Sequence, residues 1–273
     1  MVEDSGRNAA GECRFTGSIG AWIVESLGPA CDGLLNLDKP VRLTSAKALY
    51  RVRSLLKQRK SGHAGTLDPA ASGVLLICLG RATKFVERIM DLPKVYRATA
   101  RLDVTSESFD SDRPHIPVEF ARQPTIEVVR SALAAFEGGI QQVPPSISAV
   151  KVGGVPAYRH ARKGTAITLA PRAVRVYWIA LHDYRWPNLD FEICCSRGTY
   201  VRGLIRDLGV ALQTGGCLTA LSRTAIGPFK VEEAWTLEAL AAHPERAHGV
   251  IPLAQATTMI EAGRGLIPAR PSS

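Results

Sequence analysis

Residues 62–73 read Gly62-His63-Ala64-Gly65-Thr66-Leu67-Asp68-Pro69-Ala70-Ala71-Ser72-Gly73 and lead directly into an apolar run at 74–79. That run predicts a strand buried in the core. The preceding stretch places one carboxylate, Asp68, in a glycine-bounded loop at the mouth of the strand. Rigid scaffolds often carry catalytic residues on such loops, but Asp-Pro among glycines is also ordinary turn chemistry. Taken alone, the stretch favours a turn.

The composition is that of a globular protein with a basic surface. A hydrophobic fraction of 46% and a charged fraction of 22% exclude a disordered or fibrous chain. No apolar stretch approaches the roughly 20 residues of a membrane helix. The net charge of +9 favours a polyanionic partner, with nucleic acid first.

The cysteines and histidines do not form a metal-binding pattern. The six cysteines include no Cys-x-x-Cys pair, and the histidines are scattered. Cys194 and Cys195 are neighbours on an expected strand and face opposite sides. We therefore expect no metal, and thiols kept reduced in the cytoplasm. Phosphate-loop, serine-hydrolase and zinc-protease motifs are also absent from the sequence, which favours a cofactor-free reaction.

Periodicity predicts an α+β fold. Residues 94–105 alternate apolar and polar side chains, as a half-buried antiparallel strand does. Interleaved strands and hairpins favour a largely antiparallel mixed β-sheet flanked by helices over a doubly wound parallel sheet. The other expected elements are strands at 33–38 and 218–226, a hairpin at 173–195, and helices at 45–58 (capped by Thr44), 82–90, 126–137 (capped by Thr125), 200–209 and after Thr236.

Composition also divides the chain. Residues 1–32 are an amino-terminal extension that fits no secretory or transit signal, and we expect its first dozen residues to be disordered. Residues 33–255 form the expected catalytic domain, and 256–273 a short, loose tail. Within the domain, 106–112 is an acidic turn, and 144–164 predicts a mobile arm with a basic tip, although a plain solvated loop is the alternative.

An acid-free basic run precedes the Asp68 loop. A solvated helix face normally mixes charges, so an unmixed one favours contact with phosphates. Eight lysines and arginines occur between residues 39 and 60 without one acid: Lys39, Arg42, Lys47, Arg51, Arg53, Lys57, Arg59 and Lys60.

A few side chains can carry chemistry on RNA. Asp68 suits a nucleophile or general base, and Arg202, on a strand-to-helix turn, suits its cationic partner. Tyr96 offers a ring on which a base can stack. His63 either fills the stack that an extruded nucleotide leaves or bonds to the loop backbone; the sequence favours neither.

Six ordered blocks resemble the TruB family of pseudouridine synthases over roughly residues 33–255. Besides residues 33–40 and 62–73, they are Lys94-Val95-Tyr96-Arg97, Pro145-Ser146-Ile147-Ser148-Ala149-Val150-Lys151, Cys195-Ser196-Arg197-Gly198-Thr199-Tyr200-Val201-Arg202 and Leu221-Ser222-Arg223. The resemblance implies the pseudouridine synthase fold and isomerisation of the T-loop uridine of tRNA, position 55, without a cofactor. It also implies a protein that is cytoplasmic, and we expect a monomer.

The resemblance also implies residue roles. Asp68 is the essential carboxylate, Arg202 its ion-pair partner and Tyr96 the ring stacked on the target base. Tyr200 and Leu221 line the pocket, and the arm closes over the T-loop. Candidate RNA contacts are Lys39, His63, Lys151 and Arg162.

Two points remain open at this stage. Family members commonly carry a carboxy-terminal PUA module, for which too few residues follow 255, so we expect weaker tRNA binding. Two alternatives stand beside the synthase reading: an RNA-binding or tRNA-folding protein with dispensable catalysis, and a synthase directed to other RNAs by partner proteins.

Overall fold

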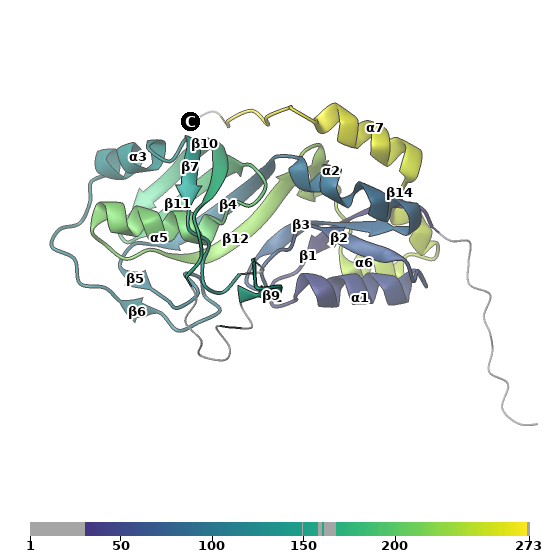
Figure 1. Cartoon of the computed structure of the whole chain (residues 1–273), viewed down its shortest axis with the longest axis horizontal. Helices are drawn as coiled ribbons and strands as arrows, with labels where there is room; N and C mark the ends of the chain where they lie inside the picture. Colours follow the sequence, from purple (N-terminus) through teal and green to yellow (C-terminus); the bar gives the residue numbers. More distant parts are fainter. Residues whose placement is uncertain (1–30, 149, 158–159, 161–167, 272–273) are drawn as a thin grey trace, which may run out of the picture.

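One ten-stranded sheet runs through the molecule (Figure 1), and the structure, a computed structural model, describes residues 31–148, 150–157, 160 and 168–271. The order along the sheet is β14 (Val250–Pro252), β1 (Gly33–Lys39), β3 (Ser72–Leu79), β12 (Cys217–Ile226), β4 (Lys94–Arg101), β11 (Asn188–Cys195), β10 (Arg172–Arg185) and β7 (Gly138–Gln142), with β13 (Phe229–Lys230) paired to β12 and β2 (Ser61–Ala64) to β3.

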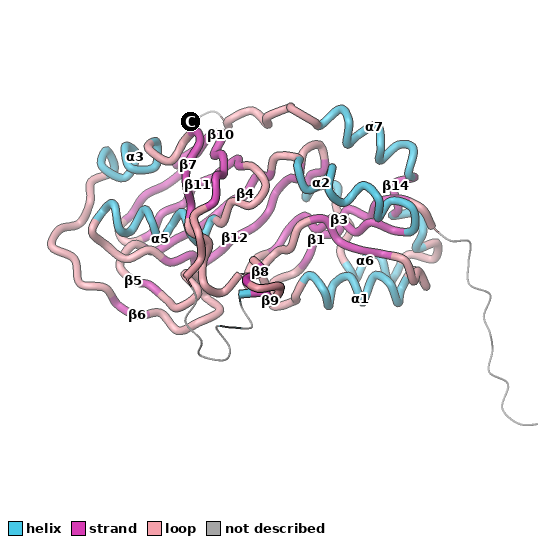
Figure 2. The backbone as a smooth tube through the Cα atoms, in the orientation of Figure 1, coloured by secondary structure: helices cyan, strands magenta, loops and turns pink. Residues whose placement is uncertain are grey.

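Helices cover the sheet, and two small hairpins lie outside it (Figure 2). The helices are α1 (Ser45–Leu55), α2 (Val86–Asp91), α3 (Ile126–Ala134), α5 (Val201–Leu212), α6 (Leu237–Ala242) and α7 (Leu253–Gly263); the hairpins pair β5 (Val104–Thr105) with β6 (Ile116–Pro117) and β8 (Lys151–Val152) with β9 (Val155–Pro156). Within these ranges no helix is long and apolar enough to cross a membrane.

The sheet consists of two antiparallel halves joined by one short parallel contact. Ser222 pairs with Ser72 and Arg223 with Gly73, where β12 meets the start of β3. Every other pairing in the sheet is antiparallel. The predicted α+β class with a largely antiparallel mixed sheet is confirmed. The junction lies at the end of the Asp68 loop.

Helices pack on both faces of the first half, which explains the uninterrupted apolar run of β3. Val74, Leu76 and Cys78 pack with Ile89 of α2 and Ile260 of α7. The intervening residues Leu75, Ile77 and Leu79 pack on the opposite face with Val52 of α1 and Leu240 of α6. Figure 1 shows α1 and α6 on one side of these strands and α2 and α7 on the other. A strand buried on both faces cannot alternate apolar with polar residues.

The second half buries its inner face under α3 and α5. The predicted apolar stripe of α5 is confirmed: Val201, Leu204, Ile205 and Leu208 pack against strand residues such as Phe191. This packing fixes the helix whose first turn carries Arg202. Burial of a side chain such as Phe191 contributes about 1.5–3 kcal/mol, so the position of α5 is strongly determined.

Two expectations need correction. Thr125 occupies the N-cap of α3, but its side chain makes no capping bond, whereas Thr44 and Thr236 accept from the amides of Lys47 and Ala239.

The expected boundary near 255 falls inside α7, whose Ala256 and Ile260 join the core. The tail beyond it is also attached, because Trp178 donates to the Pro268 carbonyl at 2.6 Å. The expected disorder at the amino terminus lies outside the described residues.

Candidate active site

Asp68 lies on the loop between β2 and β3, and the first residue of α1 and the turn before this helix fix the backbone on both sides of it. The Ser45 hydroxyl accepts from Leu67 N at 2.9 Å and donates to Leu67 O at 2.8 Å. Arg42 N donates to Pro69 O at 2.7 Å. The Asp68 carbonyl accepts from Ala71 N at 3.1 Å and closes a turn. The loop is thus a turn, as its residues indicate, and it holds the carboxylate in a defined place.

Arg202 connects Asp68 to two other segments. Its Nη2 lies 2.8 Å from Asp68 Oδ2 and donates to Ile147 O at 3.0 Å. Its Nη1 donates to Ser108 O at 3.0 Å. The Arg202 side chain is 5% exposed and that of Asp68 34% exposed. A buried guanidinium therefore lies against a partly open carboxylate, the type of group required of a nucleophile or base.

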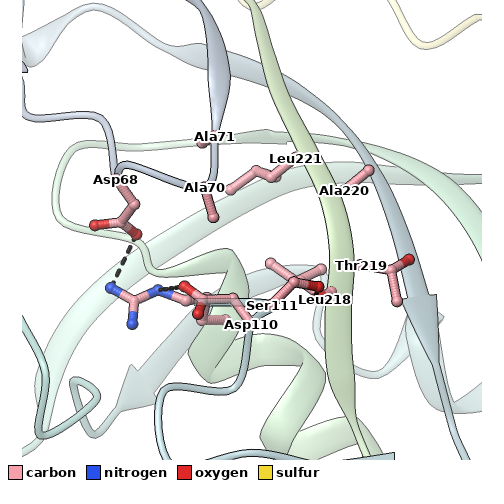
Figure 3. Close-up of a pocket in the computed structure, with 10 residues that line it drawn as sticks. Asp68, Ala70, Ala71, Asp110, Ser111, Leu218, Thr219, Ala220 and Leu221 are labelled. Carbon is pink, nitrogen blue, oxygen red and sulfur yellow. Dashed lines mark hydrogen bonds and ion pairs between the residues drawn. The ribbon is translucent and has the colours of Figure 1, made fainter. Parts of the chain in front are cut away.

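A second carboxylate, Asp110, also faces Arg202, and sequence reasoning missed it. Asp110 Oδ2 lies 3.4 Å from Arg202 Nε, and its side chain is 7% exposed. Arg202 therefore pairs with both Asp68 and Asp110. Figure 3 labels these two carboxylates, and its dashed lines mark the two ion pairs. Ser108 Oγ donates to Asp110 Oδ1 at 2.5 Å, and Asp112 N donates to the same oxygen at 3.0 Å.

The turn that presents Asp110 is itself constrained. Phe109 has φ of 58°, which an L-residue adopts at a cost of about 1–2 kcal/mol. Its amide donates to Ser106 O and its carbonyl accepts from Leu218 N, which hold the turn against β12. The sequence signal was an acidic turn with serine and aspartate two residues apart, a pattern typical of local side-chain bonds. Nothing in it pointed to Arg202.

Asp68 borders a cavity of about 330 Å³ that contains most of the predicted catalytic side chains. Tyr96 enters from β4, Tyr200 from the N-cap of α5, and Leu221 from β12. Tyr96 and Leu221 are partly buried and pack against the main core. Burial raises the pKa of both tyrosines, so each phenol remains neutral at pH 7. Asp68, Arg202, Tyr96, Tyr200 and Leu221 therefore share one site.

Gln142, at the end of β7, positions Tyr200. Its amide group accepts from Tyr200 N at 2.8 Å and donates to Tyr200 O at 3.0 Å. Gln142 is 2% exposed, so neither bond competes with bulk water. The paired bonds fix the residue that precedes α5, and with it the start of the helix that carries Arg202. No spacing in the sequence indicated this contact.

Lys39 does not occupy the place expected of an RNA contact. It is fully buried, and its ammonium donates to the carbonyls of Pro40 and Leu43, both at 2.8 Å. Burial lowers the pKa of Lys39 to about 8, and Arg223 contributes in the same direction while Asp68 opposes the shift. Its role in this structure is to hold the chain where β1 leads into α1.

The other predicted RNA contacts lie outside the cavity or outside the described part of the chain. His63 pairs with Ile77 in the β2–β3 ladder, and its Nδ1 is buried without a hydrogen-bond partner. Burial, and secondarily Arg223, lowers the pKa of His63. Lys151 belongs to β8, but its side chain is not described, and Arg162 lies outside the described residues. The roles of these three residues stay predictions.

Metal ligation is not supported by the side chains that the structure describes. No group of three or more potential ligands from histidine, cysteine, aspartate and glutamate occurs among them. Burial raises the pKa of Cys78, Cys194 and Cys195 to about 12, which keeps these thiols protonated. Protonated thiols are poor metal ligands.

Known proteins share this fold and sequence. Residues 53–201 match the N-terminal domain of TruB family pseudouridylate synthases, and 202–250 match the C-terminal domain of tRNA pseudouridylate synthase B. The chain is 47% identical to tRNA pseudouridine synthase B of Aromatoleum aromaticum, over 78% of this chain and 69% of the relative. It is 46% identical to the protein of the same name from Thiobacillus denitrificans, over 78% and 71%.

Solved structures of other proteins have a similar fold. A chain of a Cbf5-Nop10-Gar1 complex is similar with a TM-score of 0.65 at 29% identity, over 83% of this chain and 62% of that one. A chain of an H/ACA RNP bound to a substrate RNA containing 2'-deoxyuridine gives 0.62 at 26% identity, over 84% and 61%. This protein thus spans less than two thirds of either chain. From its sequence matches and its fold, the chain belongs to the TruB family of pseudouridylate synthases.

Proposed function

We propose that this protein isomerises uridine to pseudouridine in the T-loop of tRNA, at position 55, without a cofactor. The observation that carries the proposal is the ion pair between Asp68 and Arg202 at the border of a cavity with two tyrosines. The cavity has a volume of about 330 Å³, within the range of about 300–1,000 Å³ for small-molecule sites. The relatives that share nearly half of its sequence are named for tRNA.

The reaction breaks the N1–C1′ glycosidic bond, rotates the uracil and forms a C5–C1′ bond, while a proton leaves C5 and N1 gains one. Asp68, paired with Arg202, attacks C6, attacks C1′ or removes a ribose proton; each route needs a carboxylate at this place. The base must leave its stack to enter the cavity. Tyr96 then offers its ring for stacking, while Tyr200 and Leu221 bound the space.

The surface of α1 supports an RNA substrate. Lys47, Arg51 and Arg53 are exposed on this helix, whose first turn contains no acid. The helix begins beside the Asp68 loop, because Ser45 binds Leu67. Phosphates bound along α1 would therefore lead to the cavity. We further propose that His63, Lys151 and Arg162 contact the T-arm.

The experiment is release of tritium from C5-labelled uridine in a T-arm transcript. Wild-type protein should release it, and Asp68→Asn should lose at least about a thousandfold in rate, because the amide can neither attack nor accept the proton. Binding of the transcript by both proteins should agree within a few-fold. No release by wild type overturns the proposed reaction. Retained release by Asp68→Asn overturns the role of Asp68.

The likeness to the Cbf5 complex supports a second candidate, a synthase that is directed to other RNAs by partner proteins. The first candidate requires that the isolated chain turn over free tRNA, whereas the second requires partner proteins. Asp68, Arg202, Asp110 and Tyr96 all come from one chain, so we infer that the monomer is active. We also propose that it acts in the cytoplasm. Turnover that appears only after partner proteins are added would favour the second candidate, and light scattering would determine the oligomeric state.

A further inference from the structure

A second buried arginine, Arg223, binds the backbone of the Asp68 loop. It is 1% exposed. Its Nη2 donates to Gly65 O at 3.2 Å and its Nη1 to Thr66 O at 3.5 Å. Its Nε donates to Val74 O at 2.8 Å. These carbonyls lie on both sides of Asp68, so one planar group spans the two ends of the loop.

The backbone of Arg223 also meets this loop. It pairs with Gly73 where β12 runs parallel to the start of β3. A Cβ at Gly73 would lie 2.3 Å from Arg223 O, and Gly73 has φ of 101°. Only glycine combines that conformation with so close an approach. The side chain and main chain of one residue therefore fix where the loop enters β3.

The charge of Arg223 is not neutralised as that of Arg202 is. Within the described residues its guanidinium bonds to three carbonyls and to the Tyr96 side chain, and no carboxylate forms an ion pair with it. Arg223 stands opposite Tyr96 in the β4–β12 ladder, and the Arg223 Cζ lies 6.0 Å from the centre of the Tyr96 ring. A buried cation whose partners are all uncharged is costly, which indicates a use for its shape and charge.

We propose that Arg223 is a positioning residue of the reaction: its guanidinium holds the two sides of the Asp68 loop so that the carboxylate faces Arg202 and the base stacked on Tyr96. The inference rests on the proposed function, since the position of Asp68 matters only if Asp68 carries the chemistry. A misplacement of about 1 Å can reduce a rate by about a hundredfold.

The test compares two variants. Arg223→Lys keeps a positive charge but loses the planar guanidinium that binds three carbonyls, and Arg223→Met removes both the charge and the guanidinium. Single-turnover tritium release at saturating transcript should fall by roughly 30- to 300-fold in each variant, while transcript affinity stays within about threefold. The matched control is Arg101→Lys on neighbouring β4, because the Arg101 guanidinium binds Asp103 and not the Asp68 loop. The control should keep the wild-type rate.

A titration separates positioning by a charged group from a merely structural role. Because the Arg223 charge contributes to the lowered pKa of His63, Arg223→Met should raise that pKa and Arg223→Lys should leave it nearly unchanged. NMR titration of His63 measures both. If Arg223→Met does not fold, Arg223→Lys decides the question alone through its rate and affinity.

The inference is overturned if Arg223→Lys releases tritium within threefold of the wild-type rate. It is also overturned if rate and affinity fall together, because Arg223 would then act in binding RNA. Absence of release by wild type would overturn the proposed function and this inference with it. Normal wild-type release with an unaffected Arg223→Lys overturns this inference alone.

Discussion

Arg202 and Arg223 are both buried and both bind the segment that carries Asp68, yet their surroundings differ. Arg202 faces two carboxylates, Asp68 and Asp110, and two carbonyls. Arg223 has three carbonyl partners. The first arginine therefore places a positive charge against the catalytic carboxylate, whereas the second determines the course of the backbone that carries it. Both matter for the rate, because catalysis depends on electrostatic partners and on the position of the reacting groups.

The largest expected effect comes from Arg202→Met. This change removes the common cation of Asp68 and Asp110, and with it the contact at 2.8 Å to Asp68 Oδ2. We expect turnover to fall roughly a thousandfold, with transcript affinity changed only a few-fold. Arg206→Met, one turn along α5 where the guanidinium pairs with Asp207, is the control. Equal losses of rate and affinity in Arg202→Met would mean that Arg202 chiefly binds phosphate.

A smaller effect is expected from Asp110→Asn. The amide keeps the shape of the side chain but removes the charge beside Arg202 Nε, so Arg202 is free to shift from Asp68. Turnover should fall roughly ten- to a hundredfold, measured by single-turnover tritium release. Asp103→Asn, which affects the ion pair with Arg101, provides the matched control. A wild-type rate in Asp110→Asn would show that Asp68 alone orients Arg202.

On the Arg223 side, Gly62 of β2 and Gly73 of β3, the strands that flank the Asp68 loop, give a matched pair for stability. Gly73→Ala places a methyl group against Arg223 O in a left-handed conformation, and we expect a loss of roughly 2–5 kcal/mol in the free energy of unfolding. Gly62→Ala meets open space and should change it by less than about 0.5 kcal/mol. Urea denaturation measures both. Similar losses would contradict the close approach of β3 and β12.

The smallest effect is a pH dependence from the under-compensated charge near Arg223. Burial, with a contribution from Arg223, lowers the pKa of Lys39 from its ordinary 10.5 to about 8. Between these values the unfolded chain binds a proton that the folded chain does not, so the contribution of Lys39 to the free energy of unfolding rises with pH. The free energy of unfolding of wild type minus that of Lys39→Met, measured by urea denaturation, should therefore increase from about pH 7.5 to about pH 9.5. A flat or falling difference would contradict the lowered pKa.

The sequence by itself indicated the central strands and helices and the candidate catalytic residues. Apolar periodicity located these elements because burial imposes it locally, as in the unbroken run of β3 and the stripe of α5. It missed β7 and most of α7. The family blocks contain Asp68, Tyr96, Tyr200, Arg202 and Leu221, the side chains that the fold gathers around one cavity.

Only the tertiary structure decided which long-range contacts those residues make. Asp110 and Arg202 are 92 positions apart, and Arg223 lies 149 positions from Val74, so no local pattern records either contact. Lys39 looked like part of an exposed basic run, yet the chain entering α1 buries it and turns its ammonium to carbonyls. Partners of a buried charge depend on which segments the sheet brings together. Here the pairing of β3 with β12 brings Arg223 against the Asp68 loop.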